Sequence, residues 1–168
     1  MTFDDWLKSV PKEITEDSIW KMEAYRLSLF LADLAWHDAT KLMGDRRTLD
    51  LAGQLYSSVG SIEANIAEGY SRGSGRDRAR FYEYALGSAR ESRGWYYKGR
   101  HVLKEVVAQH RMVLITHIAR LLLKMVPDQR ASGPSLHEDV IEYRIETDWG
   151  AALSPGQIAE LLQDVPMG

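Results

Sequence analysis

Apolar residues recur with the period of an α-helix in four long stretches of the chain. These stretches cover residues 18–43, 48–69, 76–103 and 105–125, and their apolar side chains stand three or four positions apart. Three short breaks separate them, at Gly44-Asp45, at residues 69–75 and, weakly marked, near Lys104. Because connections this short favour antiparallel neighbours, we predict an all-α fold, an antiparallel four-helix bundle that runs up-down-up-down.

The second and fourth predicted helices each have one narrow apolar face, which is typical of helices that pack in a core. The third helix instead has small residues on its inner face, among them Ala85, Ser88 and Ser92, for which we expect core packing. Its glycines Gly87, Gly94 and Gly99 each cost about 1 kcal/mol relative to alanine inside a helix. We therefore expect a neighbouring helix to come close to these three glycines.

The first predicted helix has two apolar faces, and one bundle core covers only one of them. The inner face includes Trp20, Leu27, Leu31 and Leu34, and the opposite face is formed by Met22, Tyr25, Leu29 and Trp36. Residues 1–17, an N-terminal arm, can fold back over the second face through Phe3, Trp6 and Leu7. We favour a subunit interface, since soluble monomers rarely expose a large apolar patch. Met22, Tyr25, Leu29 and Trp36 are thus the predicted oligomer interface.

The pattern changes after the bundle, which we place at residues 18–126. Residues 127–168 form an acidic C-terminal extension in which apolar and polar residues alternate from Ile141 to Trp149, as in a β-strand. Ser154 to Gln157 then has the form of a capping box with proline at the first helical position, followed by a short apolar segment. A lone strand and a lone short helix are not stable alone. We expect this extension to dock on the bundle, bind a partner protein or stay partly flexible.

Composition and charge narrow the class of protein. The 168 residues are 45% hydrophobic and include no cysteine, so we expect one domain without disulfides or thiolate metal sites. The N-terminus has acids where a secretory signal needs bases, and no apolar run reaches the length of a membrane span. A cytoplasmic location is expected. The net charge is −3 in residues 1–17, +6 in 18–127 and −6 in 128–168, a basic body between acidic ends.

Four arginines lie in and just after the glycine-rich break between the second and third helices: Arg72, Arg76, Arg78 and Arg80. Over residues 72–100 there are eight bases and three acids, so this surface is suited to phosphates, and the backbone at a helix start attracts anions. The alternative is a solvated face with ion pairs four residues apart. We name these arginines as candidate contacts for RNA, DNA or another anion, for which the acidic extension would compete.

No catalytic, cofactor-binding or metal site is predicted. His110 and His117 stand two turns apart on the fourth helix, roughly 10 Å, which is too far to hold one ion. His37 and Asp38 are interpreted as a surface pair. The predicted inner faces carry almost no carboxylate or histidine, and the metal-binding patterns of bundle enzymes are missing from the sequence. We therefore expect a protein that binds rather than catalyses.

Several short motifs, in order, resemble a known family. They are NIAEG at Asn65–Gly69, Arg72 and Ser74 in the break, Phe81, and ALGS at Ala85–Ser88 followed by Glu91. Between Trp20 and Met125 the chain resembles the bundle proteins encoded in intervening sequences of bacterial 23S ribosomal RNA genes. That resemblance implies a ring-like homo-oligomer, commonly a pentamer, with no established enzymatic activity. A related branch, the accessory variability determinant proteins of diversity-generating retroelements, binds a reverse transcriptase and contacts nucleic acid through basic surfaces.

The motif residues have a structural and a functional interpretation. Asn65, Glu68 and Arg72 form either a functional triad or a set of helix-end contacts, in which Asn65 satisfies backbone groups and Glu68 holds Arg72. We favour the structural role, and expect Glu91 to bridge to an arginine. The structural motif residues are Asn65, Glu68, Gly69, Phe81, Gly87, Ser88 and Glu91. The resulting hypothesis is a non-enzymatic, oligomeric scaffold whose partner is a reverse transcriptase or another nucleic-acid-handling protein; direct RNA or DNA binding is the alternative.

Overall fold

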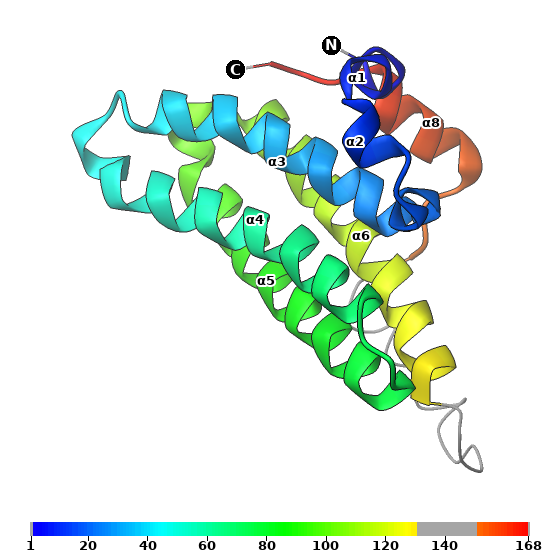
Figure 1. The fold of residues 1–168 in the computed structure, drawn as a ribbon. Coiled ribbons are helices and arrows are strands. Elements are labelled where there is room, and N and C mark those ends of the chain that lie inside the picture. The colour runs from blue at the N-terminus through cyan, green and yellow to red at the C-terminus, as the bar shows by residue number, and fades with distance from the viewer. Residues whose placement is uncertain (1, 131–150, 168) are drawn as a thin grey trace.

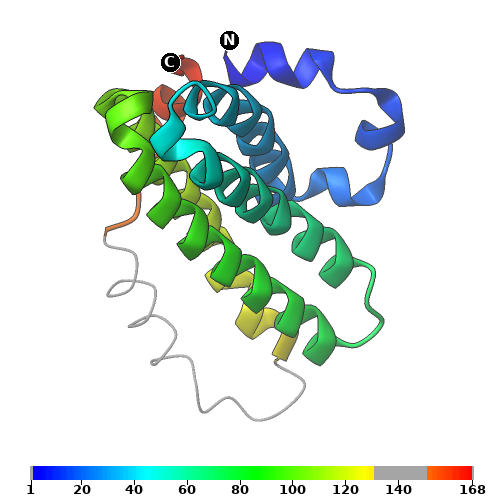
Figure 2. The same ribbon diagram turned by 90° about the vertical axis from the view of Figure 1, so that its left-hand side faces the viewer.

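Four long helices make up most of the molecule. The computed structural model describes residues 2–130 and 151–167, and no strand occurs among them. The long helices are α3 (Glu23–Leu42), α4 (Leu49–Tyr70), α5 (Gly75–Leu103) and α6 (Glu105–Arg130). Each packs against the next along the chain, and α3 also packs against α6 (Figures 1 and 2). The predicted all-helical class is confirmed, and the predicted strand at residues 141–149 lies outside the described residues.

Short helices flank this core at both ends of the chain. They are α1 (Phe3–Ser9), α2 (Lys12–Thr15), the 3-10 turn Ser18–Lys21 and α8 (Pro155–Gln163). A second 3-10 turn, Arg46–Thr48, connects α3 to α4. The predicted capping box is confirmed at the start of α8, where the Ser154 hydroxyl accepts from the Gln157 N–H. The first predicted helix is shorter than expected because a 3-10 turn replaces its start. Conversely, α6 continues through Pro127 to Arg130.

The helix boundaries follow from local chemistry. At the start of α5, the Ser74 hydroxyl accepts a hydrogen bond from the Asp77 N–H at 3.1 Å, so a free helical N–H is satisfied. Between α5 and α6 a single residue, Lys104, adopts a positive φ of 77°. One left-handed residue reverses the chain without a loop. This explains why the sequence marks that break so weakly.

Only one of the three α5 glycines lies at a close helix contact. A Cβ on Gly99 would stand 3.2 Å from the Leu42 side chain of α3, whereas Gly87 and Gly94 have open space around them. The expectation of close packing at Gly87 and Gly94 was therefore wrong. A close contact of α4 with α5 occurs instead at Gly69, where a Cβ would stand 2.8 Å from the ring of Tyr82. That ring is buried, so the contact cannot relax easily.

The N-terminal arm packs on α3 around Phe30, which belongs to neither of the two predicted apolar faces. The indole of Trp6 is buried against Phe30 and Trp20, with ring centroids 5.3 and 6.1 Å away. Its Nε1 donates to Asp33 Oδ2 at 2.8 Å. Phe30 lies between the two faces of α3 and Asp33 borders the second face. Trp36, farther along the second face, stays 59% exposed.

The apolar character of α6 reflects its place in the core. The stretch Glu105–Gln129 is long and apolar enough to cross a membrane, yet 67% of its most apolar part is buried inside the molecule. The other long helices supply the surface that covers it. Burial within the protein therefore accounts for this hydrophobicity.

The Gly69 contact yields a stability prediction with a matched control. We expect Gly69→Ala to lower the free energy of unfolding by about 1–3 kcal/mol, because the added methyl group overpacks the buried Tyr82 ring. Gly87→Ala, in open space on the neighbouring helix, should raise it by about 0.5–1 kcal/mol. Urea unfolding followed by circular dichroism measures both. A stabilising Gly69→Ala would contradict the close crossing.

Candidate functional site

Three of the four candidate arginines already have partners within the molecule. Arg72 forms an ion pair with Glu68, as predicted, and its guanidinium lies 4.8 Å from the centre of the Phe81 ring. Arg80 pairs with Asp77 at 3.5 Å. The side chain of Arg78 donates to the carbonyl oxygen of Arg72 at 2.8 Å, and also to Gly73 and Gln129.

These contacts give the arginine turn a structural role. Arg78 satisfies carbonyl oxygens between α4 and α5 and joins them to the end of α6. A phosphate would compete with these partners for Arg72, Arg78 and Arg80. Arg76, by contrast, is exposed at the start of α5. The predicted anion contact stays a prediction, and Arg76 could meet a phosphate without giving up any of the contacts described above.

The other motif residues hold local backbone or neighbouring side chains. The Asn65 amide donates to the Ser61 carbonyl one turn earlier at 2.7 Å, and the Ser88 hydroxyl donates to the Tyr84 carbonyl. Glu91 accepts from the indole of Trp95 at 3.2 Å, and the expected bridge from Glu91 to an arginine stays a prediction. These contacts support the structural interpretation of the motif.

An exposed apolar surface lies on α3 and α4. Of the predicted interface residues, Met22, Tyr25 and Leu29 are half-buried against the core, and Trp36 is 59% exposed. The Trp36 ring meets the Tyr56 ring of α4 edge-on, with centroids 5.8 Å apart. Two more exposed apolar side chains lie on the same helices or at their ends. We call this set the aromatic face: Trp36, Met43, Leu49 and Tyr56.

A buried ion pair joins α3 to α6. Arg111 is completely buried and Asp38 is 2% exposed. Arg111 Nε donates to Asp38 Oδ2 at 2.8 Å, and Nη2 reaches Oδ1 at 3.4 Å. The hydroxyl of Tyr96, on α5, donates to the same carboxylate at 3.1 Å. Asp38 is therefore not the surface neighbour of His37 that the sequence suggested, but the polar centre of the core.

His110 extends this cluster toward the C-terminal segment. Its Nδ1 lies 2.9 Å from Arg111 Nη1, and because a guanidinium only donates, Nδ1 must accept. The proton of the neutral ring is then on Nε2, which donates to the carbonyl oxygen of Leu161 at 2.7 Å. Burial is the main cause that lowers the pKa of His110, and Arg111 adds to the effect. The pKa of Tyr96, by contrast, is raised, mainly by burial and also by the negative charge of Asp38.

The C-terminal segment is attached through these same side chains. Arg111 Nη2 donates to the Pro166 carbonyl at 3.0 Å, beside the contact from His110 to Leu161. Farther along, the Gln163 amide donates to Asp4 Oδ2 of α1 at 3.4 Å. The two ends of the chain therefore meet at one corner of the molecule (Figure 1).

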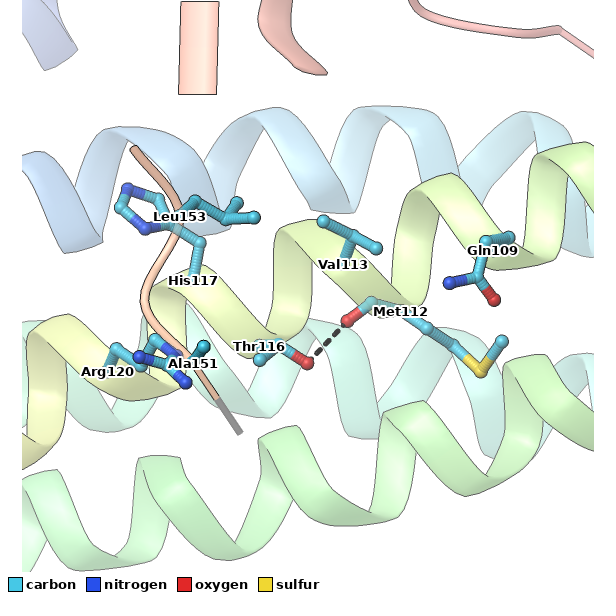
Figure 3. A pocket seen from close by; sticks show the side chains of 8 residues that line it. All are labelled: Gln109, Met112, Val113, Thr116, His117, Arg120, Ala151 and Leu153. Atoms are coloured by element: carbon cyan, nitrogen blue, oxygen red, sulfur yellow. Dashed lines mark hydrogen bonds between the residues drawn. The ribbon is translucent and has the colours of Figure 1, made fainter. Parts of the chain in front are cut away.

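A pocket of about 240 Å³ opens where the chain leads into α8. Figure 3 shows residues 151–153 crossing α6, with Leu153 beside His117 and Ala151 beside Arg120. His117 Nε2 lies 3.5 Å from Glu23 Oε1. The remaining lining residues are Gln109, Met112, Val113 and Thr116. Within the described ranges, no three histidine, aspartate or glutamate side chains converge as metal ligands would.

Sequence reasoning missed the Asp38–Arg111 pair, although a signal was present. At 100° per residue, Asp38 falls within the inner apolar face of its helix, and Arg111 falls between Val107 and Leu122 on the inner face of its own. Opposite charges inside two separate apolar faces indicate a buried pair, since an unpaired buried charge is very costly.

Comparison with known proteins identifies similarity over the bundle. The family model described as 23S rRNA-intervening sequence protein matches residues 20–124. The match begins after the N-terminal arm and ends within α6. A search of curated proteins and a search of solved structures found no significant match.

Breaking the buried ion pair should be far more damaging than breaking an exposed one. We expect Arg111→Met to lower the free energy of unfolding by about 3–5 kcal/mol, because the Asp38 carboxylate stays buried without its cation. Arg47→Met, which removes the exposed partner of Asp45, should leave the urea midpoint nearly unchanged. Adding Asp38→Leu to Arg111→Met should recover part of the loss. Equal effects of the two single changes would refute a buried pair.

Stability should also depend on the protonation of His110. Its pKa is lower in the folded than in the unfolded state, so below about pH 6.5 the unfolded chain binds more protons. The free energy of unfolding should be fully retained above that pH and fall as the pH drops to 5.5. His110→Gln keeps a donor and an acceptor without titrating, so this variant should lose less stability between pH 7.5 and 5.5. Urea titrations at both pH values compare them, and identical losses would exclude His110 as the cause.

Proposed function

The chain belongs to the family of 23S rRNA-intervening sequence proteins, and we propose that it acts without catalysis, as a homo-oligomeric scaffold that binds a partner protein or ribonucleoprotein in the cytoplasm. In this proposal the four long helices form an antiparallel bundle, as the sequence predicts, and the subunits assemble in a ring. The family resemblance suggests five copies. The partner class is a reverse transcriptase or another nucleic-acid-handling protein.

The aromatic face is the observation that carries the assembly part of the proposal. Trp36 is 59% and Tyr56 43% exposed. Met43 follows Trp36, and Leu49 precedes Tyr56, by seven residues, so helical spacing places each on the same side of its helix. The N-terminal arm packs beside Phe30 instead and leaves this surface uncovered. Monomeric proteins rarely keep a contiguous patch of this kind in water, so a second copy is the occupant that we propose.

The position of the buried charges supports a binding role over catalysis. A catalytic acid or base must reach its substrate within hydrogen-bond distance. Asp38 and Arg111 are enclosed by the core, and Tyr96 is completely buried as well. Their hydrogen bonds to one another and to the C-terminal segment fit a structural role, because these groups hold elements together where no substrate can enter.

Direct nucleic-acid binding is the second candidate function. It is favoured by the excess of bases between residues 72 and 100 and by the exposure of Arg76. It ranks second because Arg72, Arg78 and Arg80 would have to exchange intramolecular partners for phosphates. In this alternative the acidic extension lowers affinity by occupying the same basic surface.

Light scattering at micromolar concentration tests the assembly. We expect the wild-type protein to have a mass several times that of one chain, and Trp36→Lys with Tyr56→Lys to have the mass of a monomer, since two charges then face the apolar contact. The control is Tyr84→Lys with Tyr97→Lys, which removes two equally exposed aromatic side chains from α5. This control should assemble as the wild type does. A monomeric wild-type protein would refute the oligomer, and an assembled Trp36/Tyr56 variant would refute this interface.

A further inference from the structure

The end of α8 is capped by side chains of the bundle. The last four carbonyl groups of a helix have no partner within it. In α8, the Glu160 carbonyl accepts from the Asp164 N–H, which closes the helix, and the Leu161 carbonyl accepts from His110. Two residues past the cap, the Pro166 carbonyl accepts from Arg111. Donors at the negative end of a helix are also favoured by its dipole.

These two contacts recognise main-chain atoms, whatever the side chains are. Both acceptors are carbonyl oxygens, so any helix that ends here and continues as an extended segment could supply them. Apolar packing adds the side-chain preference, since Leu161, Leu162 and Val165 are half-buried against the core. The site therefore selects a short amphipathic helix followed by an extended apolar segment.

The attachment of α8 is shallow, although the site beneath it favours an occupant. No residue of α8 is fully buried, and the pocket under residues 151–153 is not filled by the chain that crosses it. Yet without α8 and the residues that follow it, His110 and Arg111 would each lose an acceptor near the core, which is unfavourable for buried donors. Replacement of α8 by another helix that supplies the same acceptors should therefore cost less free energy than removal of α8 alone.

The chain is long enough for α8 to leave while it remains attached. Residues 131–150 connect α6 to the segment that crosses it, and 20 residues can span up to about 66 Å. The end of α6 lies only about 15 Å along the helix from Arg120, beside which Ala151 lies. This length of chain exceeds the separation of its two ends, so α8 could move away from the bundle and remain covalently attached.

We propose that the corner formed by α1, His110 and Arg111 is a docking site for the C-terminal end of a short amphipathic helix, that α8 is its resident occupant, and that a partner protein displaces α8 by presenting a helix of the same kind. This inference rests on the partner-binding part of the proposed function and specifies the chemistry of the partner. It does not depend on the number of subunits.

A synthetic, fluorescein-labelled peptide of residues 152–167 serves as the probe of this site. Fluorescence anisotropy measures its binding to three full-length proteins. In the first, Leu161→Asp with Leu162→Asp weakens the docking of the protein's own α8. In the second, Asp4→Cys with Gln163→Cys is joined by a short bismaleimide; these are the only thiols, because the natural chain has no cysteine. The third is the wild-type protein.

We expect the Leu161/Leu162 variant to bind the peptide at least ten-fold more tightly than the wild type does. The cross-linked protein should bind the peptide at least ten-fold more weakly than the same double-cysteine protein does before cross-linking. A peptide that carries the two leucine-to-aspartate changes is the control and should not bind. Equal affinity of all three proteins, or no binding to a variant whose circular dichroism is native, would overturn the proposal. Cross-linking that yields covalent dimers would also overturn it, because α8 would then dock on a second copy.

Hydrogen exchange on the unaltered protein provides an independent measurement if the leucine variant does not fold. Amides of Ile158–Gln163 should exchange faster than those of the middle of α6, and excess unlabelled probe peptide should accelerate them further. Exchange of α8 only together with α6, by global unfolding, would refute a displaceable helix. Light scattering separates the two proposals, since a monomeric protein that binds the peptide refutes the oligomer and leaves the docking site standing.

Discussion

The buried ion pair between Asp38 and Arg111 constrains the arrangement of the other elements. A charge this deep is tolerated only if its partner and its remaining hydrogen bonds are in place. That requirement sets the position of α3 along α6, because a shift of one turn would separate the two groups by about 5 Å. Tyr96 adds the same demand on α5. Apolar packing alone tolerates several alignments of helices, whereas this cluster specifies one.

The same cluster makes the C-terminal segment part of the bundle. Arg111 reaches both Asp38 in the core and the Pro166 carbonyl at the surface, and His110 links it to Leu161. The N-terminal arm is tied to the same corner by a contact from Gln163 to Asp4. A shift of α6 relative to α3 would therefore also move the donors that hold the C-terminal segment, where both ends of the chain meet. This shared hydrogen-bond network is a structural basis on which the core and the proposed docking site could be coupled.

Arginine has three different roles in this protein, according to its surroundings. Arg111 is a buried structural cation, Arg78 satisfies carbonyl oxygens between two helices, and Arg76 is exposed to solvent. The count of eight bases over residues 72–100 therefore overstates the positive charge that is available to a polyanion. Among the described residues, an exposed and largely apolar surface lies on α3 and α4, where Trp36 and Tyr56 meet. For this reason we propose binding to a protein partner as the leading function and direct nucleic-acid binding as the second candidate.

The sequence by itself determined the features that depend on residues a few positions apart. Helical periods located the four long helices, the Ser154 capping box located α8, and the Glu68–Arg72 pair was expected from its spacing of four. The tertiary structure alone decided which glycine lies at the close crossing, where the N-terminal arm packs, and that Asp38 meets Arg111. Periodicity predicts which face of a helix is buried, but not how two packed helices are aligned along their axes. The contact between Asp38 and Arg111 joins residues 73 positions apart, so it depends on the alignment of whole helices rather than on local pattern.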